Sequence, residues 1–355
     1  MAEVSDLASQ ACSWLWYAYA FWIAHFEGTV NLDSPRITVV GSYATGLTMK
    51  VDRLPRTGET LLGTGYRVDY GGKGSNQAVG CARLGARISF VAKIGKDSFG
   101  DMALRLYRDE GIDTAWVLQT GVAPTGVGFI TVEASSGHNC IVLDPGANEL
   151  LTAEDVAACR AGLESSGIVL TQLEIPVEAA EAALALGRAG GAITILNPAP
   201  VRPLPSSVLA LVDILTPNQA EAKVLAGESP DATIEPAAVA RRLIQKGVKQ
   251  VVMTLGEKGA VIVTPSCVCH IPAVSVRAVD TTGAGDAFNA GLATALAAGA
   301  TLEEGVQFAA VTGGMAVIRE GVIPSLPHRD EVLAFHRQRS LTPPAWLIAD
   351  RVVGD

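Results

Sequence analysis

Short apolar and β-branched runs alternate with longer Ala- and Leu-rich segments along most of this chain, from Ile37 onward. The runs predict strands at 37–40, 89–93, 168–172, 192–197, 214–216, 250–255, 260–264 and 273–279. The longer segments predict helices at 76–84, 100–110, 177–189, 219–226, 236–246, 286–298 and 302–318. Crossovers of helical length favour a mostly parallel sheet with helices on both faces. The pattern therefore predicts an α/β protein with a doubly wound sheet.

Two segments, 47–70 and 122–143, break this alternation. They lack helical periodicity and carry Thr, Val, Tyr and turn-forming Gly, which is typical of strands. Ligands of open α/β sheets bind in the crevice at the carboxyl ends of the parallel strands. We expect the two segments to form a small β-sheet lid over that crevice.

The first 34 residues differ in composition, since they hold seven of the nineteen aromatic residues. Their apolar run, 11–26, is shorter than the roughly 20 residues of a membrane-spanning helix, and no Lys or Arg precedes Arg36. We expect a dispensable extension at 1–34, a main domain at 35–338 and a C-terminal tail at 339–355. A helix at 1–34 that binds a partner or a membrane interface is the alternative.

Charge and cysteine content limit the classes of partner and the cellular location that we expect. The chain has 36 acidic and 27 basic residues, and the basic ones are scattered, so we expect no nucleic-acid or anionic membrane partner. Six dispersed cysteines favour a reducing, cytoplasmic location. Cys267, Cys269 and His270 could suggest a metal site, but alternate positions in a β-branched run favour one face of a strand.

The segment 280–288, DTTGAGDAF, places two glycines before a predicted helix. Small residues allow a tight turn at a helix N-terminus, where free N–H groups and the helix dipole favour an anion. Asp286 would lie beside that anion and could take a proton from an attacking hydroxyl. The alternative is that Asp286 is only the N-cap of the helix.

A second glycine-rich segment, GGKGSNQA at 71–78, leads from an expected lid strand into a helix. Its bare backbone would permit close approach of a small polyol, and Lys73 and Asn76 would add hydrogen-bond donors. An ordinary helix start has a similar pattern, so both interpretations stay open.

Two further segments, 216–221 and 254–259, follow predicted strands and would line the same crevice. Asn218 and Glu221 could orient phosphates and Mg²⁺ through water, and the turn 254–259 could hold a nucleotide. Each could also be a plain strand-to-helix loop. The chain has no P-loop motif, and Phe288 occupies a position where a dinucleotide-binding turn needs a small residue.

Together these motifs resemble the ribokinase branch of the PfkB-type carbohydrate kinases over residues 37–335. The resemblance is carried by Gly41-Ser42, PRTGET at 55–60, the glycine run 71–76, QLE at 172–174, NPAP at 197–200, Asn218 with Glu221, and the turn 280–286. It implies transfer of the ATP γ-phosphoryl group to a primary hydroxyl of a furanose-like sugar, with D-ribose to D-ribose 5-phosphate as the leading case. A different furanose or a nucleoside as acceptor, and a catalytically silent sugar-binding regulator, are the alternatives.

The resemblance also implies roles for single residues. It implies a catalytic base at Asp286 and an anion hole from the backbone of Gly283, Ala284 and Gly285. It implies sugar contacts at Gly71, Gly72, Lys73, Gly74, Ser75, Asn76, Glu174 and Asp286. It implies nucleotide contacts at Asn218, Glu221, Thr254, Leu255, Gly256, Glu257, Lys258, Gly259, Gly285 and Ala310.

The same resemblance implies ATP as phosphoryl donor, Mg²⁺, K⁺ as activator and a homodimer formed through the lid. Its monovalent-cation loop corresponds to Asp280, Thr282, Ala316, Arg319, Gly321 and Ser325. One position departs from the family, since ribokinases typically carry an Asp four positions after the Ser of Gly41-Ser42, and this chain has Gly46 there. Glycine cannot accept the hydrogen bonds of sugar hydroxyls, so the identity of the sugar depends on this position.

Overall fold

The computed structural model describes residues 36–348, and the predicted extension at 1–34 lies outside these residues. The division into extension, main domain and tail therefore stays a prediction. No helix within 36–348 is long and apolar enough to cross a membrane.

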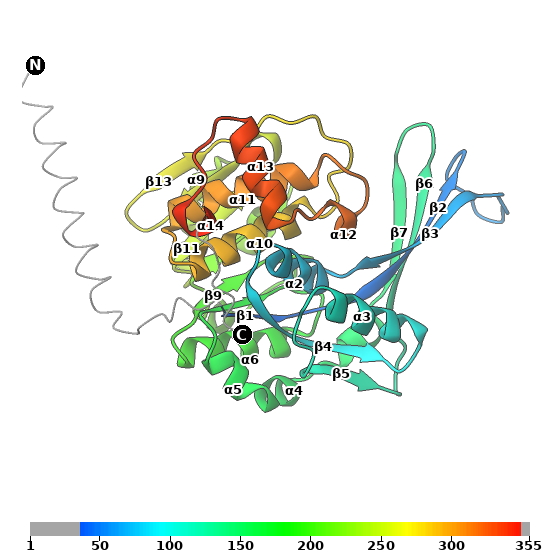
Figure 1. The fold of residues 1–355 in the computed structure, drawn as a ribbon, viewed down its shortest axis with the longest axis horizontal. Coiled ribbons are helices and arrows are strands. Elements are labelled where there is room, and N and C mark those ends of the chain that lie inside the picture. The colour runs from blue at the N-terminus through cyan, green and yellow to red at the C-terminus, as the bar shows by residue number, and fades with distance from the viewer. Residues whose placement is uncertain (1–35, 349–355) are drawn as a thin grey trace, which may run out of the picture. The chain divides into compact units, whose positions relative to one another are not determined.

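A nine-stranded, mostly parallel sheet forms the centre of the described part (Figure 1). Seven neighbouring strands are parallel to one another, and β12 and β13 are antiparallel at one edge. The spatial order is β13 (Val268–Ile271), β12 (Ala260–Val263), β11 (Gln250–Thr254), β10 (Ile214–Leu215), β9 (Ile193–Leu196), β8 (Ile168–Thr171), β1 (Arg36–Val40), β4 (Arg87–Gly95) and β5 (Val117–Thr120).

Helices cover both faces of this sheet, so that its strands, apart from the edge strand β13, contribute to two cores. Ile37 and Val39 of β1 enter one core, and Val40 enters the other. The first core contains residues of α2 (Lys73–Arg83), α3 (Ser98–Asp109), α10 (Ala284–Ala297), α11 (Leu302–Ala316) and α13 (Arg329–Gln338). The second contains residues of α4 (Ala153–Ala158), α5 (Arg160–Glu164), α6 (Val177–Ala189), α7 (Ser206–Leu209), α8 (Gln219–Ala226) and α9 (Pro236–Gln245). The predicted doubly wound fold is confirmed.

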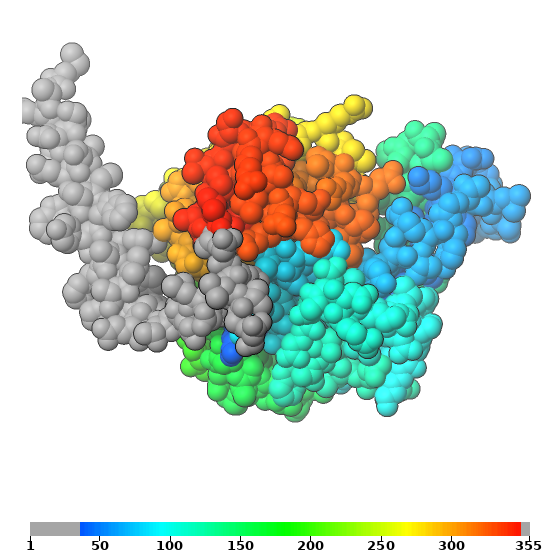
Figure 2. Space-filling model, in the orientation of Figure 1, coloured from blue at the N-terminus to red at the C-terminus, as the bar shows by residue number. Residues whose placement is uncertain are grey.

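A separate four-stranded sheet is the lid sheet, in the order β3 (Thr64–Gly71), β2 (Ala44–Val51), β6 (Gly126–Glu133) and β7 (Asn139–Asp144). It projects from one side of the main body (Figures 1 and 2). β2 starts four residues after β1 ends, and β3 leads directly into α2. The lid sheet is therefore anchored at the glycine run 71–76, and the prediction of a small second sheet is confirmed.

Two local predictions were wrong. Residues 273–279 are not a strand, because the N–H groups of Val279 and Asp280 both donate to the carbonyl of Val317 at the end of α11 and not to a sheet neighbour. Helices α2 and α10 begin three and two residues earlier than expected, at Lys73 and Ala284. Glycine has a low helix propensity, but tertiary packing stabilises the helical conformation of both glycine-containing first turns.

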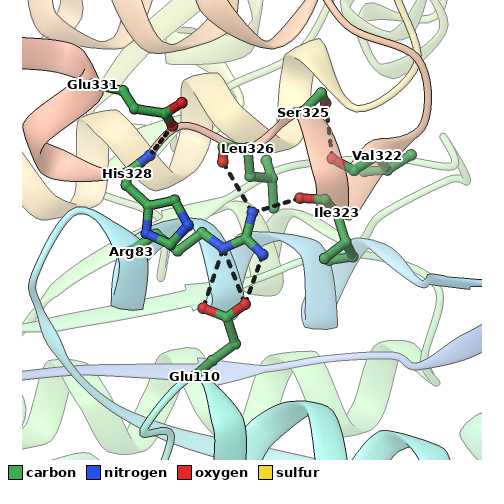
Figure 3. A network of polar contacts seen from close by, with 8 residues as sticks. All are labelled: Arg83, Glu110, Val322, Ile323, Ser325, Leu326, His328 and Glu331. Atoms are coloured by element: carbon green, nitrogen blue, oxygen red, sulfur yellow. Dashed lines mark hydrogen bonds and ion pairs between the residues drawn. The ribbon is translucent and has the colours of Figure 1, made fainter. Parts of the chain in front are cut away.

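Arg83, the last residue of α2, joins three helices (Figure 3). Its Nε and Nη2 donate to the carboxylate of Glu110 after α3, and its Nη1 donates to the carbonyls of Ile323 and Leu326 at 2.6 and 3.0 Å. Ile323 belongs to α12 (Val322–Ser325). The side chains of Arg83 and Glu110 are only 12% and 14% exposed, so this ion pair is largely shielded from water.

We expect Arg83→Leu to lower the free energy of unfolding by about 3 kcal/mol, because it leaves the Glu110 charge and two carbonyls without their partner. Urea denaturation measures this change. The control is Arg160→Leu, which removes the exposed pair with Glu164 and should cost under about 1 kcal/mol. Equal effects of the two substitutions would contradict the role given to the Arg83 network.

Candidate active site

The turn before α10 depends on glycine at position 283. Gly283 is the N-cap residue, with φ of 80°, in the left-handed region that favours glycine. A Cβ atom there would also lie 2.5 Å from Cγ1 of Val322 in α12. Asp286 therefore lies in the first turn of α10, and its interpretation as the N-cap was wrong.

The carboxylate of Asp286 is held by two amides of α2. Asn76 Nδ2 donates to Oδ2 at 2.8 Å, and Gln77 Nε2 donates to Oδ1 at 3.0 Å. Asp286 is buried, and burial raises its pKa although the charge of Lys73 and the two amide donors oppose this rise. A carboxyl group with a raised pKa, held in a fixed orientation, is suited to accepting a proton.

Lys73 and Glu174 meet at the start of α2. The backbone N–H of Lys73 and the Ser42 hydroxyl both donate to Glu174 Oε2, at 2.8 and 2.6 Å. Burial lowers the pKa of the Lys73 ammonium, but the charges of Asp286, Glu174 and Glu221 outweigh this effect and raise it overall. Lys73 is therefore a cation in the middle of three carboxylates.

A chain of buried amides connects α2 to the ends of the parallel strands. Gln172 Nε2 donates to Gln77 Oε1 at 2.6 Å, and Gln77 Nε2, which also binds Asp286, donates to Asn197 Oδ1 at 3.1 Å. Asn197 Nδ2 donates to the carbonyl of Thr216 at 3.1 Å. Because Gln77 uses both ends of its amide, its orientation is determined by the network.

A second link runs back to the glycine turn. The Thr216 hydroxyl bonds to Asn289 Oδ1 at 2.6 Å, and Asn289 Nδ2 donates to the carbonyl of Gly285 at 2.8 Å. The sequence interpretation missed Gln77 and Asn289. The available signal was that both are polar residues close to a predicted site residue, since Gln77 follows Asn76 and Asn289 is three residues after Asp286.

A cavity of about 240 Å³ lies in front of these groups. It brings together seven of the predicted site residues: Lys73, Asn218, Glu221, Thr254, Gly283, Gly285 and Asp286. Thr216, from the segment 216–221 that was predicted to line the crevice, also lines it, as do four residues that were given no single role: Asn197, Ala199, Thr281 and Asn289. Segments separated by more than 200 residues thus converge on one polar crevice.

Asn218 and Glu221 form the capping box of α8. Asn218 Oδ1 accepts from Glu221 N–H at 2.9 Å, and Glu221 Oε2 accepts from Asn218 N–H at 2.8 Å. Burial raises the pKa of Glu221. These oxygen atoms suit a hard cation such as Mg²⁺, but no cluster of three acidic, His or Cys side chains within 36–348 could hold a metal by itself. Phosphate and water oxygens would have to complete such a site.

The other residues predicted to contact the nucleotide do not lie together in this cavity. Gly256, Glu257 and Lys258 form a short, exposed 3₁₀ helix after β11, next to Leu255 and Gly259. Ala310 of α11 lines a different cavity of about 750 Å³. The structure therefore does not place Ala310 or the residues 255–259 in the cavity in front of Asp286.

The residues predicted for a cation lie on two adjoining loops. Asp280 Oδ1 and Oδ2 accept from the N–H groups of Thr282 and Gly321, at 2.9 and 3.0 Å. Burial opposes ionisation of Asp280, yet the hydrogen bonds from Thr282 and Gly321 lower its pKa overall. The buried Ser325 hydroxyl donates to the Val322 carbonyl. An anionic oxygen, a hydroxyl and main-chain carbonyls fit a monovalent cation.

Besides Gly321, which has no side chain, two of the predicted cation-loop residues offer no side-chain ligand. Ala316 is buried at the end of α11, and the Arg319 guanidinium pairs with Glu331 at 2.5 Å. Only their backbone carbonyls are available to a cation.

Comparison with known proteins identifies the family. The model of the pfkB family carbohydrate kinases matches residues 34–329. The chain belongs to this family. It is 38% identical to a ribokinase of Haemophilus influenzae over 299 residues, which cover 84% of this chain and 97% of that protein. It is 35% identical to a deoxyribokinase of Salmonella typhimurium over 292 residues, which cover 82% of this chain and 95% of that protein.

A solved relative agrees with the fold. The structure of Arabidopsis thaliana ribokinase complexed with ribose and ATP has a TM-score of 0.78 and 30% sequence identity, covering 89% of this chain and 99% of that chain. This member of the pfkB family is thus an ATP-dependent carbohydrate kinase, as the sequence predicted.

The raised pKa of Asp286 predicts a pH-dependent stability difference. In the unfolded chain the Asp286 carboxyl ionises at about pH 3.9. In the folded protein it stays protonated to a higher pH, because its pKa is raised. The folded state therefore loses stability relative to the unfolded state as the pH rises through the folded pKa. Asp286→Asn cannot ionise. The free energy of unfolding of the variant, minus that of the unaltered protein, should therefore increase as the pH rises from about 4 through the folded pKa, on the order of 1 kcal/mol per unit of pKa difference.

Urea denaturation at several pH values measures this difference. A flat difference for Asp286→Asn would contradict the raised pKa.

Proposed function

We propose that the protein transfers the ATP γ-phosphoryl group to the primary hydroxyl of a furanose-like sugar, with D-ribose as the leading acceptor. One observation carries this proposal: the buried Asp286 carboxylate is oriented by Asn76 and Gln77 in front of a polar cavity at the N-terminus of α10. The ribokinase relatives support ribose, and the ribokinase of Arabidopsis thaliana has been solved with ribose and ATP.

Asp286 acts as the general base. Each of its oxygens accepts one amide hydrogen and keeps a further lone pair for the sugar hydroxyl. The hydroxyl oxygen forms the new bond to phosphorus, the bond from phosphorus to the ADP oxygen breaks, and the hydroxyl proton passes to Asp286. Glu174, which is fixed by Ser42 and the Lys73 N–H, accepts hydrogen bonds from other sugar hydroxyls.

The first turn of α10 stabilises the transferring group. The N–H groups of Gly283, Ala284 and Gly285 are at the positive end of the helix dipole. A Cβ atom at Gly285 would meet no other atom within 4 Å, so the turn is open to a ligand. The ammonium of Lys73 lines the same cavity and adds positive charge where negative charge develops.

The remaining assignments follow the family resemblance. Gly71, Gly72, Gly74 and Ser75 frame the sugar, and Thr254 borders the nucleotide at the cavity. The residues 255–259 and Ala310 lie outside this cavity and are proposed to contact the rest of the nucleotide. Asn218 and Glu221 would hold Mg²⁺ through water, and the ion would neutralise phosphate charge. Asp280, Thr282 and Ser325, with the carbonyls of Ala316, Arg319 and Gly321, would hold K⁺ beside the turn.

We also propose a homodimer through the lid sheet. One face of this sheet exposes the large apolar side chains of Met49, Phe129 and Val142, which a partner could cover. Phe129 and Val142 are direct cross-strand neighbours, so they form one continuous apolar surface. A second copy of the lid sheet would match this surface by symmetry.

The deoxyribokinase relatives are the specific reason to keep a second acceptor under test. A panel of ribose, 2-deoxyribose, fructose and nucleosides, with ADP release as the readout, separates these acceptors. If none of these compounds causes release of ADP, a catalytically silent sugar-binding protein is favoured.

Asp286→Asn should lower kcat by about 10²- to 10⁴-fold while ATP binding is kept, because the amide cannot take the proton. Steady-state kinetics and calorimetric nucleotide binding measure the two quantities. The control is Asp231→Asn at an exposed position, which should leave both unchanged. Near-normal turnover of the Asp286 variant would remove it from the role of base.

Potassium should raise kcat, because a cation held by Asp280 and its neighbours would order the adjoining turn 281–285. The measurement compares rates in potassium chloride and in tetramethylammonium chloride at equal ionic strength. Asp280→Asn should abolish the difference. Identical rates of the unaltered protein in the two salts would contradict a cation site at this loop.

A further inference from the structure

On one face of the lid sheet the bases of β2, β3 and β6 carry almost no side chains, and Leu143 of β7, which pairs with Gly128, borders them. Cross-strand partners share a face of a sheet, and Ala44 pairs with both Gly71 and Gly126, while Gly46 pairs with Gly128. Four of these five positions are glycine and the fifth is alanine. This glycine-floored face adjoins the start of α2, because Gly71 is followed directly by Gly72 and Lys73.

Asp69 carries the nearest charged group on this face. It pairs with Gly46 across β2 and β3, and a Cβ atom at Gly46 would lie 3.7 Å from the Asp69 Cβ. Its Oδ2 accepts from Arg67 Nε at 2.5 Å and from Thr48 Oγ1 at 3.4 Å. Within 36–348 no side chain or N–H is recorded as a donor to its Oδ1 atom, and the side chain is 24% exposed.

The same face is turned toward the catalytic turn. Arg67, two residues before Asp69, is on this face, and its Nη1 lies 4.0 Å from the carboxylate of Glu320. Glu320 precedes Gly321, whose N–H binds Asp280 at the start of the turn 280–286. β3 also lies beside α12 in the fold (Figure 1). Asp69 is thus located between the base of the lid and the loops that flank Asp286.

We propose that Asp69 is the carboxylate that binds the sugar hydroxyls remote from the phosphorylated one, in the space left by Gly46. This inference rests on the proposed function, and it names the group that selects the sugar. Arg67 holds one oxygen of Asp69, and the other oxygen accepts from the sugar. The extended backbone covers about 3.3 Å per residue, so Asp69 is about 7 Å from Gly71, which is within the reach of one bound sugar.

A purely structural role would need a strong ion pair with Arg67. The Arg67 side chain is 44% exposed, and pairs in such a setting contribute little to stability. The two roles therefore predict different results: a sugar-binding role changes the KM for sugar, and a structural role changes the free energy of unfolding.

The test uses the sugar that the unaltered protein phosphorylates fastest. Asp69→Asn should raise the KM for that sugar about tenfold or more, because the bonds lost are charge-assisted, and should leave the KM for ATP within about twofold. If this sugar is ribose, 2-deoxyribose should be affected less, since it lacks one of the hydroxyls. The control is Asp52→Asn, an exposed carboxylate of the same lid, which should change neither KM.

Moving the carboxylate across the strands gives a second, independent test. Gly46 is outside the left-handed region, and a side chain there would meet Ile130 Cδ1 at 3.4 Å, an ordinary contact. The double variant Gly46→Asp with Asp69→Ala should therefore recover sugar affinity that Asp69→Ala alone loses. Urea denaturation of each variant shows that it is folded.

The outcomes distinguish a failure of the role proposed for Asp69 from a failure of the proposed kinase function. Sugar turnover with an unchanged sugar KM in Asp69→Asn, or a change in stability alone, would overturn the role of Asp69 and leave the kinase function intact. No turnover of any sugar by the unaltered protein would overturn the proposed function, and the role of Asp69 with it.

Discussion

The burial of the Asp286 carboxylate is the constraint on which the site depends. A buried carboxylate is costly unless donors compensate for the water it loses, and here Asn76 and Gln77 supply one hydrogen bond to each oxygen. Those donors are on α2, while Asp286 is on α10, so the two helices must pack together at one register. The amide chain through Gln77, Gln172, Asn197 and Thr216 extends this requirement to the ends of three strands.

The loop 320–326 supports the same site from behind. Val322 fills the space that a side chain at Gly283 would need, Asp280 binds the Gly321 N–H, and Arg83 binds the carbonyls of Ile323 and Leu326. Because Arg83 ends the helix that Lys73 begins, α2 contacts the sugar side of the crevice at one end and the support of the glycine turn at the other. A shift of α2 would therefore change both the crevice at Lys73 and the support of the glycine turn at Arg83.

The lid sheet differs from the main sheet in how much of its two faces is buried. Tyr43 and Thr45 at the start of β2 are fully buried, whereas the strands farther out expose Phe129 and Val142. The glycine-rich positions on one face at its base pack against no core, and their cost in conformational freedom is compatible with a role in binding. Asp69 supplies the charge on this face that Gly46 lacks.

The sequence by itself determined the main fold and much of the candidate site. Hydrophobic periodicity predicted seven of the nine strands of the main sheet, because burial on both faces leaves continuous apolar runs such as Ile168–Thr171. Glycine and polar residues at strand ends indicated Lys73, Asn218 and Asp286, because tight turns and helix starts need particular residue types in local order.

Only the tertiary structure decided the contacts between distant segments. Gln77 looks like an ordinary helix residue until α2 packs on α10, and Asn289 does so until α10 meets Thr216 at the end of β10. Residues 273–279 look like a strand until Val317 supplies the hydrogen-bond acceptor of Val279. The pairing of Gly46 with Asp69 depends on strand register. Local sequence patterns encode the conformation of a segment, but these partners are 23 to more than 200 residues apart, and only packing brings them together.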